Sequence, residues 1–257
     1  MNKKLYILIF SLVVVLAIGF CVNLKYSSGG ANNQITPTLE PSPLITDQPA
    51  NIVFSPTALP TTEPQIPNSY LIENFPFQSQ APFANWDQLH DEACEEASLI
   101  LTYYYINGKS INANEMEDQI QKMVQWEIEN WSEHKDLTIK ETSNLVKSFY
   151  GLSNFEIKNN ITIDDIKKEV SAGHPVIVPT AGRLLGNPNF RSPGPVYHMV
   201  VVIGFSGNTM IVQDVGTRNG NHYQYNEKIF YNAIHDWAGS ADNIETGQKT
   251  MLIFQKN

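Results

Sequence analysis

Cysteine is scarce in this chain, since only Cys21 and Cys94 occur among 257 residues. Cys21 lies in an apolar N-terminal segment, so Cys94 has no partner for a disulfide in the domain that follows. Exported domains usually use cysteines in pairs, which makes a lone thiol unusual there. Such a thiol is either a small buried hydrophobic group or a reactive one, and its neighbours must decide between the two.

Basic residues are also few: 17 Lys and Arg stand against 26 Asp and Glu, which gives a net charge of −9. The residues before position 69 are balanced in charge, so the remainder of the chain carries the whole excess. Binding to nucleic acid requires a basic footprint on the protein surface. We therefore expect no nucleic-acid partner.

Large apolar residues are rare in residues 27–68, which contain many Pro, Thr, Ser and Asn. A segment of this composition cannot bury enough surface to offset the loss of chain entropy on folding. Residues 27–68 are therefore predicted to be a disordered Pro/Thr-rich linker, with a tether favoured over a recognition motif. The folded domain is then residues 69–257, the size of a single domain.

The one long apolar run spans residues 5–24, about the length that crosses a bilayer. Lys3 and Lys4 precede it, and positive charge on the cytoplasmic side would leave the rest of the chain outside. Residues 1–26 are thus predicted to be an uncleaved membrane anchor. The chain is thus predicted to be a single-pass membrane protein whose folded domain lies outside the cytoplasm. A cleaved signal segment is the alternative.

Helices are expected early in the domain and strands later, which predicts an α+β fold of N-terminal helices packed on a mostly antiparallel sheet. Asp91 is a candidate N-cap for the first long helix, and Thr138 with Glu141 forms a capping-box pattern. The helices are predicted at 94–106, 112–130, 138–149, 163–171 and 226–237, and the strands at 174–180, 196–205, 209–215 and 250–255.

Cys94 falls in the first turn of a predicted helix that is apolar on nearly every side. Unpaired backbone N–H groups at a helix start favour the thiolate, which is the nucleophilic form of cysteine. Three neighbouring carboxylates, Glu92, Glu95 and Glu96, oppose it unless their side chains point to solvent. The helix start alone is therefore insufficient, and the fold must bring in a base.

His198 is the best candidate for that base, because it interrupts an otherwise apolar strand. With a three-residue loop at 206–208, His198 and Asp214 become diagonal neighbours on one face of a hairpin. A two-residue loop would put them on opposite faces unless a bulge restored the parity. A buried histidine with an ordinary hydrogen bond is the alternative.

Gln88 lies six residues before Cys94, on the segment that leads into its helix. A side-chain amide there, together with the Cys94 backbone N–H, could stabilise the oxyanion of a tetrahedral intermediate. The glutamine alone is a weak signal. Combined with the lone thiol and the His198–Asp214 hairpin, the set becomes specific.

In order and local setting these residues resemble the bacteriocin-leader-processing (double-glycine) cysteine peptidases and their papain-like relatives. The resemblance covers residues 70–255, and stretches such as "YHMVVVIGF" and "QDVGTRNG" look like a C39-like branch of bacterial surface proteins. It implies a papain-like fold in which Cys94 is the nucleophile, His198 the base, Asp214 its orienting partner and Gln88 the oxyanion donor. The classical members have Asp before the cysteine and Gly after it, where this chain has Ala93 and Glu95. We also expect no attached transporter, so the resemblance implies the fold and the chemistry more strongly than a leader-peptide substrate.

The loop at 181–195 directly precedes the strand of His198 and should border the site. Its candidate substrate-binding residues are Arg183, Asn187 and Arg191. The guanidinium of either arginine could position a substrate carboxylate. An ordinary solvated loop is the alternative.

A metal centre is not expected. His90 and Cys94 have the spacing of two ligands on one helix face, but no further Cys and no HExxH pair accompanies them. We expect neither a metal nor another cofactor.

The sequence therefore predicts a membrane-anchored thiol peptidase that hydrolyses peptide or isopeptide bonds in a peptide or protein substrate. Two alternatives stay open. The same thiol could transfer an acyl group to an amine, or the domain could be a surface binding module without turnover.

Overall fold

The computed structural model describes residues 65–255, in which a seven-stranded sheet is the central element. The strand order is β2-β7-β3-β4-β5-β6, β1 pairs with β4, and all pairs are antiparallel. The strands are β1 (Ser69–Leu71), β2 (Phe155–Asn159), β3 (Val176–Ala181), β4 (Tyr197–Ser206), β5 (Thr209–Gln213), β6 (Tyr223–Asn226) and β7 (Thr250–Phe254).

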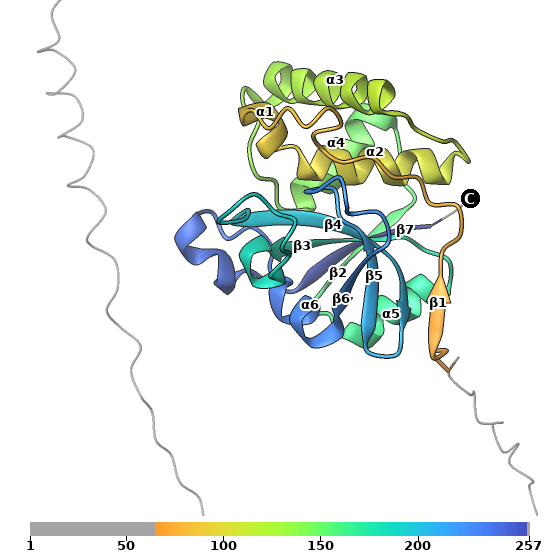
Figure 1. The fold of residues 1–257 in the computed structure, drawn as a ribbon. Coiled ribbons are helices and arrows are strands. Elements are labelled where there is room, and N and C mark those ends of the chain that lie inside the picture. The colour runs from red at the N-terminus through yellow and green to blue at the C-terminus, as the bar shows by residue number, and fades with distance from the viewer. Residues whose placement is uncertain (1–64, 256–257) are drawn as a thin grey trace, which may run out of the picture. The chain divides into compact units, whose positions relative to one another are not determined.

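Helices cover both faces of this sheet (Figure 1). Helices α2, α3 and α4 gather on one face, where α2 packs along β4, and α5 and α6 lie on the other. The helices are α1 (Gln88–Asp91), α2 (Cys94–Ile106), α3 (Ala113–Trp131), α4 (Ile139–Tyr150), α5 (Ile163–Ser171) and α6 (Glu227–Ala233), with short 3-10 turns η1 (Gly182–Leu185) and η2 (Ala241–Thr246). The predicted α+β class is confirmed.

The central strands β3 and β7 are buried along their whole length, and β4 is buried except at Ser206. A strand covered on both faces needs apolar side chains at successive positions rather than at alternate ones. This explains why β4 reads as one continuous apolar run. His198 is a polar exception in that run, and it is 1% exposed.

The predicted helix starts are partly correct. The Thr138–Glu141 capping box is present, with the Thr138 side chain accepting from the Glu141 N–H and the Glu141 carboxylate accepting from Thr138. The prediction of Asp91 as N-cap of α2 is wrong. Asp91 ends the separate short helix α1, whose cap is Asp87, and α2 starts after Ala93 without a side-chain cap.

The β4–β5 hairpin differs from the predicted three-residue loop. Ser206 pairs with Thr209, so the turn has two residues. A bulge between Val202 and Gly204 then shifts the register, and Val201 pairs with Gln213. The bulge restores the parity that the short turn would have removed, so His198 and Asp214 still project from the same face.

The predicted single-pass membrane location, with attachment through an N-terminal helix, is contradicted. Among residues 65–255 no helix is both long and apolar enough to cross a bilayer. The longest of these helices, α3, has 19 residues but carries charged side chains throughout. The apolar run at 5–24, on which the prediction rested, lies outside the described residues. So does nearly all of the predicted linker, and the domain boundaries stay predictions.

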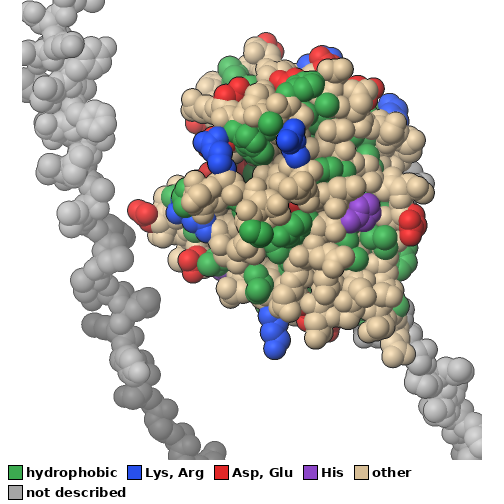
Figure 2. All heavy atoms as spheres, in the orientation of Figure 1, with side chains coloured by type: hydrophobic (Ala, Val, Ile, Leu, Met, Phe, Trp, Pro, Cys, Tyr) green, Lys and Arg blue, Asp and Glu red, His purple; other side chains and the backbone are tan. Residues whose placement is uncertain are grey.

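The face of the domain drawn in Figure 2 carries few Lys and Arg side chains, and they form no continuous basic patch there. Hydrophobic and uncharged polar side chains make up most of this face, and acidic groups lie scattered near its rim.

Candidate active site

The bulged hairpin joins His198 and Asp214 in a buried contact. His198 Nε2 lies 2.8 Å from Asp214 Oδ1, and the two side chains are 1% and 0% exposed. A carboxylate can only accept, so Nε2 carries the hydrogen and Nδ1 is left as an acceptor. This is the tautomer that a general base acting through Nδ1 requires.

Asp214 is held in place by further donors. Its Oδ2 accepts from Asn187 Nδ2 at 2.9 Å and from the Tyr225 hydroxyl, and its Oδ1 also accepts from the Gly216 N–H at 3.1 Å. Burial alone would raise the pKa of Asp214, but the neighbouring His198 ring and these hydrogen bonds outweigh it and hold the pKa below its usual value. The carboxylate therefore stays ionised and oriented.

Cys94 begins α2, whose next turn touches β4 through the Ser98 hydroxyl and the Met199 carbonyl, 3.3 Å apart. This packing brings the start of α2 beside the start of β4, where His198 lies. The Cys94 thiol, 3% exposed, donates to Glu95 Oε2 at 2.9 Å. Within residues 65–255 no hydrogen bond joins Cys94 to His198, so the structure pairs the predicted base with Asp214 but leaves the thiol on Glu95.

Two of the three acidic neighbours of Cys94 point inward, whereas Glu92 is half-buried and lines the cleft described below. Glu95 and Glu96 are both fully buried, and Glu95 also accepts from the Leu137 N–H at 2.8 Å. Burial raises the pKa of the Cys94 thiol well above its usual value, and the charges of Glu95, Asp136 and Glu96 raise it further. In this arrangement burial, with the carboxylates adding to it, outweighs the effect of the helix start on the pKa, and the thiol is protonated at neutral pH.

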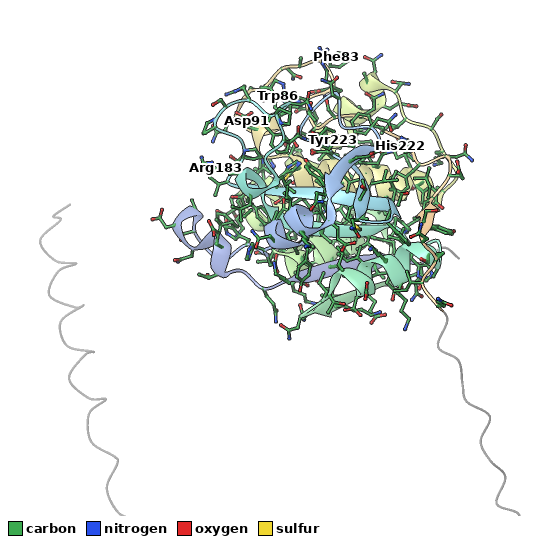
Figure 3. All side chains as sticks on the ribbon, turned by 60° about the horizontal axis from the view of Figure 1, so that its bottom comes forward. Phe83, Trp86, Asp91, Arg183, His222 and Tyr223 are labelled. Atoms are coloured by element: carbon green, nitrogen blue, oxygen red, sulfur yellow. The ribbon has the colours of Figure 1, made fainter. Side chains whose placement is uncertain are left out.

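A cleft of about 750 Å³ opens beside His198. Its walls come from the segment before α2 and from the two loops that flank the β4–β5 hairpin. Its lining includes Gln80, Trp86, Phe190, Arg191, His198 and Gly216. Trp86 and Asp91 lie on the segment that leads into α2, and Arg183 lies on the same side of the domain (Figure 3).

Gln80, which the sequence did not single out, lies in this cleft and is 4% exposed. Its Nε2 donates to the His90 carbonyl at 2.8 Å and to the Asp91 carbonyl at 3.3 Å, so it fixes the segment just before Cys94. Gln88, the predicted oxyanion donor, is exposed at the start of α1. It lines an adjoining hollow rather than the cleft of His198. The oxyanion role of Gln88 stays a prediction, and Gln80 is a second candidate by its position in the cleft.

The three candidate substrate-binding residues separate in space. Arg191 lines the cleft, where it lies 3.6 Å from Asp91 and donates to the Trp86 carbonyl. Arg183 lies outside the cleft lining, and its Nε donates to the Gly194 carbonyl at 3.2 Å. Asn187 is buried and bonded to Asp214, which makes it a positioning residue rather than a substrate contact.

His90 does not join Cys94. Its two ring nitrogens lie 2.7 Å from Asp87 and 3.0 Å from Glu117, while the thiol is bonded to Glu95. The described geometry thus forms no ligand pair from these two residues.

Gly216 provides a direct check on the position of the imidazole. A Cβ at this residue would lie 2.8 Å from His198 Cε1, closer than real Cβ contacts, and 3.0 Å from Phe190 Cε1, which is tighter than most of them. We expect Gly216→Ala to displace the His198 ring and to lower kcat more than it raises KM, which steady-state kinetics would measure. The matched control is Gly207→Ala, where nothing lies within 4 Å, although its φ of +54° adds local strain. Equal kinetics for Gly216→Ala and the wild type would contradict the placement.

Residues 72–242 match the Peptidase_C39 like family. Among solved structures, a protein described as a C39-like peptidase from Bacillus anthracis is similar, with a TM-score of 0.49 and 17% identity. That match covers 74% of this chain and 98% of the other. No curated protein matches the sequence. Because the family match spans most of the chain, the predicted resemblance is confirmed: the chain belongs to the Peptidase_C39 like family, and this membership implies a cysteine peptidase.

Proposed function

We propose that the chain hydrolyses peptide bonds with Cys94 as nucleophile, His198 as general base and Asp214 as the residue that orients His198. The observation that carries the proposal is the buried His198–Asp214 pair at the cleft, beside the helix that starts at Cys94. Peptide or protein is the substrate class, since the cleft is open and lined by both aromatic and polar side chains.

The reaction begins when the Cys94 side chain turns from Glu95 toward His198, whose Nδ1 takes the thiol proton. The thiolate attacks the scissile carbonyl carbon, and the negative oxygen is stabilised by the Cys94 backbone N–H and by the amide of Gln80, which exchanges its longer bond, at 3.3 Å to the Asp91 carbonyl, for the oxyanion. His198 then gives its proton to the departing amine, which leaves a thioester on Cys94. A water, deprotonated by His198, attacks the thioester and releases the acid and the free thiol.

The bond between Cys94 and Glu95 is the feature that this mechanism must overcome. It also favours a second candidate, a binding module of the same fold that does not turn over, because the thiol is protonated and faces away from its base. The two candidates differ in whether substrate draws the thiol out of this contact.

Gln80 and Gln88 form a matched pair for testing the oxyanion role. We expect Gln80→Ala to lower kcat by about 10²–10³, the cost of one lost oxyanion donor, with a much smaller change in KM. Gln88→Ala, at an exposed position, should retain wild-type turnover. A larger fall in kcat for Gln88→Ala than for Gln80→Ala would instead assign the oxyanion role to Gln88.

The proposed function is tested by exposing a mixture of peptides to the full-length chain and identifying new termini by mass spectrometry, with and without a primary amine. Hydrolysis predicts free carboxyl termini that require Cys94. Products that carry the added amine in place of a carboxylate would show acyl transfer instead. A folded chain that binds peptides without producing either would favour the binding module.

A further inference from the structure

A second cluster of functional groups is formed by three residues that do not line the cleft of His198. It consists of Glu96 on α2, Glu127 on α3 and His134 on the segment between α3 and α4. Each offers one ligand atom, and these atoms all lie within 4.8 Å of one another. The side chains of Glu96 and Glu127 are fully buried, and that of His134 is 10% exposed.

The polar atoms of this cluster lack the hydrogen bonds that burial demands. Five buried atoms have no hydrogen-bond partner among the described residues: both carboxylate oxygens of Glu96, both of Glu127, and Nε2 of His134. His134 Nε2 and Glu96 Oε1 are 3.4 Å apart. A buried carboxylate is expensive unless it is paired or coordinates a metal, and here two of them face each other. One atom from each side chain lies near enough to the other two for a single ion to satisfy all three.

We propose that Glu96, Glu127 and His134 bind one divalent transition-metal ion, of which Zn²⁺ fits best. Two carboxylates and one imidazole form a mixed oxygen and nitrogen set that Zn²⁺ accepts at about 2.0–2.2 Å. Mg²⁺ and Ca²⁺ prefer oxygen ligands throughout, so the imidazole disfavours them. Small side-chain rotations would close the 4.8 Å spread to a common ion.

A route from solvent reaches this position. His134 lines the same hollow as Gln88, together with Glu92 and Asp136, so an ion could enter there and keep a water on its open side. The acidic groups along this route would attract a cation. Bound there, the ion would cross-link α2, α3 and the segment leading to α4. It would therefore stabilise the packing of the helix that begins at Cys94.

Zn²⁺ binding to the full-length chain tests the proposal, measured by calorimetry after removal of metals with a chelator. We expect about one ion per chain and a higher Tm on Zn²⁺ addition. Glu127→Gln should lower the affinity by more than the roughly 10–100-fold that loss of an outer partner of a metal ligand costs. Glu129→Gln, an exposed neighbour on the same helix, should bind as the wild type does. X-ray absorption should show oxygen and nitrogen neighbours, including an imidazole.

Two further measurements keep the test independent of folding and of the peptidase proposal. His134→Gln should also lose the ion, and circular dichroism would establish that both variants remain folded. Cys94→Ser should bind Zn²⁺ unchanged, because the thiol is not a ligand. Absence of binding at millimolar Zn²⁺, or equal affinity in Glu127→Gln, would overturn the proposal. The two carboxyl groups would then have to share a proton instead.

Discussion

Replacement of Cys94 by serine is expected to abolish peptide hydrolysis while the domain stays folded. Loss of the nucleophile in a coupled nucleophile–base pair costs on the order of 10⁶ in kcat, which would leave no detectable turnover. The serine hydroxyl can donate to Glu95 Oε2 as the thiol does, so the buried contact at the start of α2 is preserved. Product formation followed by mass spectrometry, with a thermal melt of the same sample, measures both effects.

Cys21→Ser is the matched control, because it removes the other cysteine of the chain and leaves Cys94 in place. It should hydrolyse peptides at the wild-type rate. Turnover that persists in Cys94→Ser would exclude Cys94 as the nucleophile.

Asp214→Asn is expected to lower kcat by about 10⁴, the cost of holding the imidazole in the wrong tautomer. The Asn carbonyl would keep the place of Oδ2, where Asn187 and Tyr225 donate. Its amide would then face His198 Nε2, which must accept, so Nδ1 would carry the proton and could not take one from the thiol. The Gly216 N–H would lose its acceptor, which we expect to cost about 1–3 kcal/mol of stability.

Tyr225→Phe separates the tautomer effect from simple loss of a hydrogen bond. It removes one donor to Asp214 but leaves the carboxylate and the bond to His198 in place. We expect a much smaller fall in kcat than for Asp214→Asn, measured on the same peptide. Equal losses in the two variants would show that packing around Asp214, rather than the proton position on His198, controls the rate.

The sequence was informative where one local pattern dominated. The apolar run from Cys94 gave α2 its bounds, and the Thr138–Glu141 box marked the start of α4. The short edge strands β2 and β6 were missed, because four or five mixed residues carry no clear period and gain their stability from pairing in the sheet.

The site was predictable only in part. Parity on the hairpin correctly placed His198 beside Asp214, although a bulge rather than a three-residue loop achieves it. Gln80 was missed because its distance from Cys94 is set by the path of the intervening loop, not by a helix period. The inward direction of Glu95 and Glu96 was equally hidden, since charged residues are rarely fully buried.

The most direct test of the account is covalent capture of Cys94 by a peptide-derived acylating probe, located by peptide mapping. We expect a single adduct on Cys94 in the folded full-length chain, and a much lower yield of that adduct in His198→Ala. Cys21, the other cysteine of the sequence, serves as the internal reference. An adduct that forms on Cys94 equally in His198→Ala, or none on Cys94 in folded protein, would contradict the Cys94–His198 mechanism.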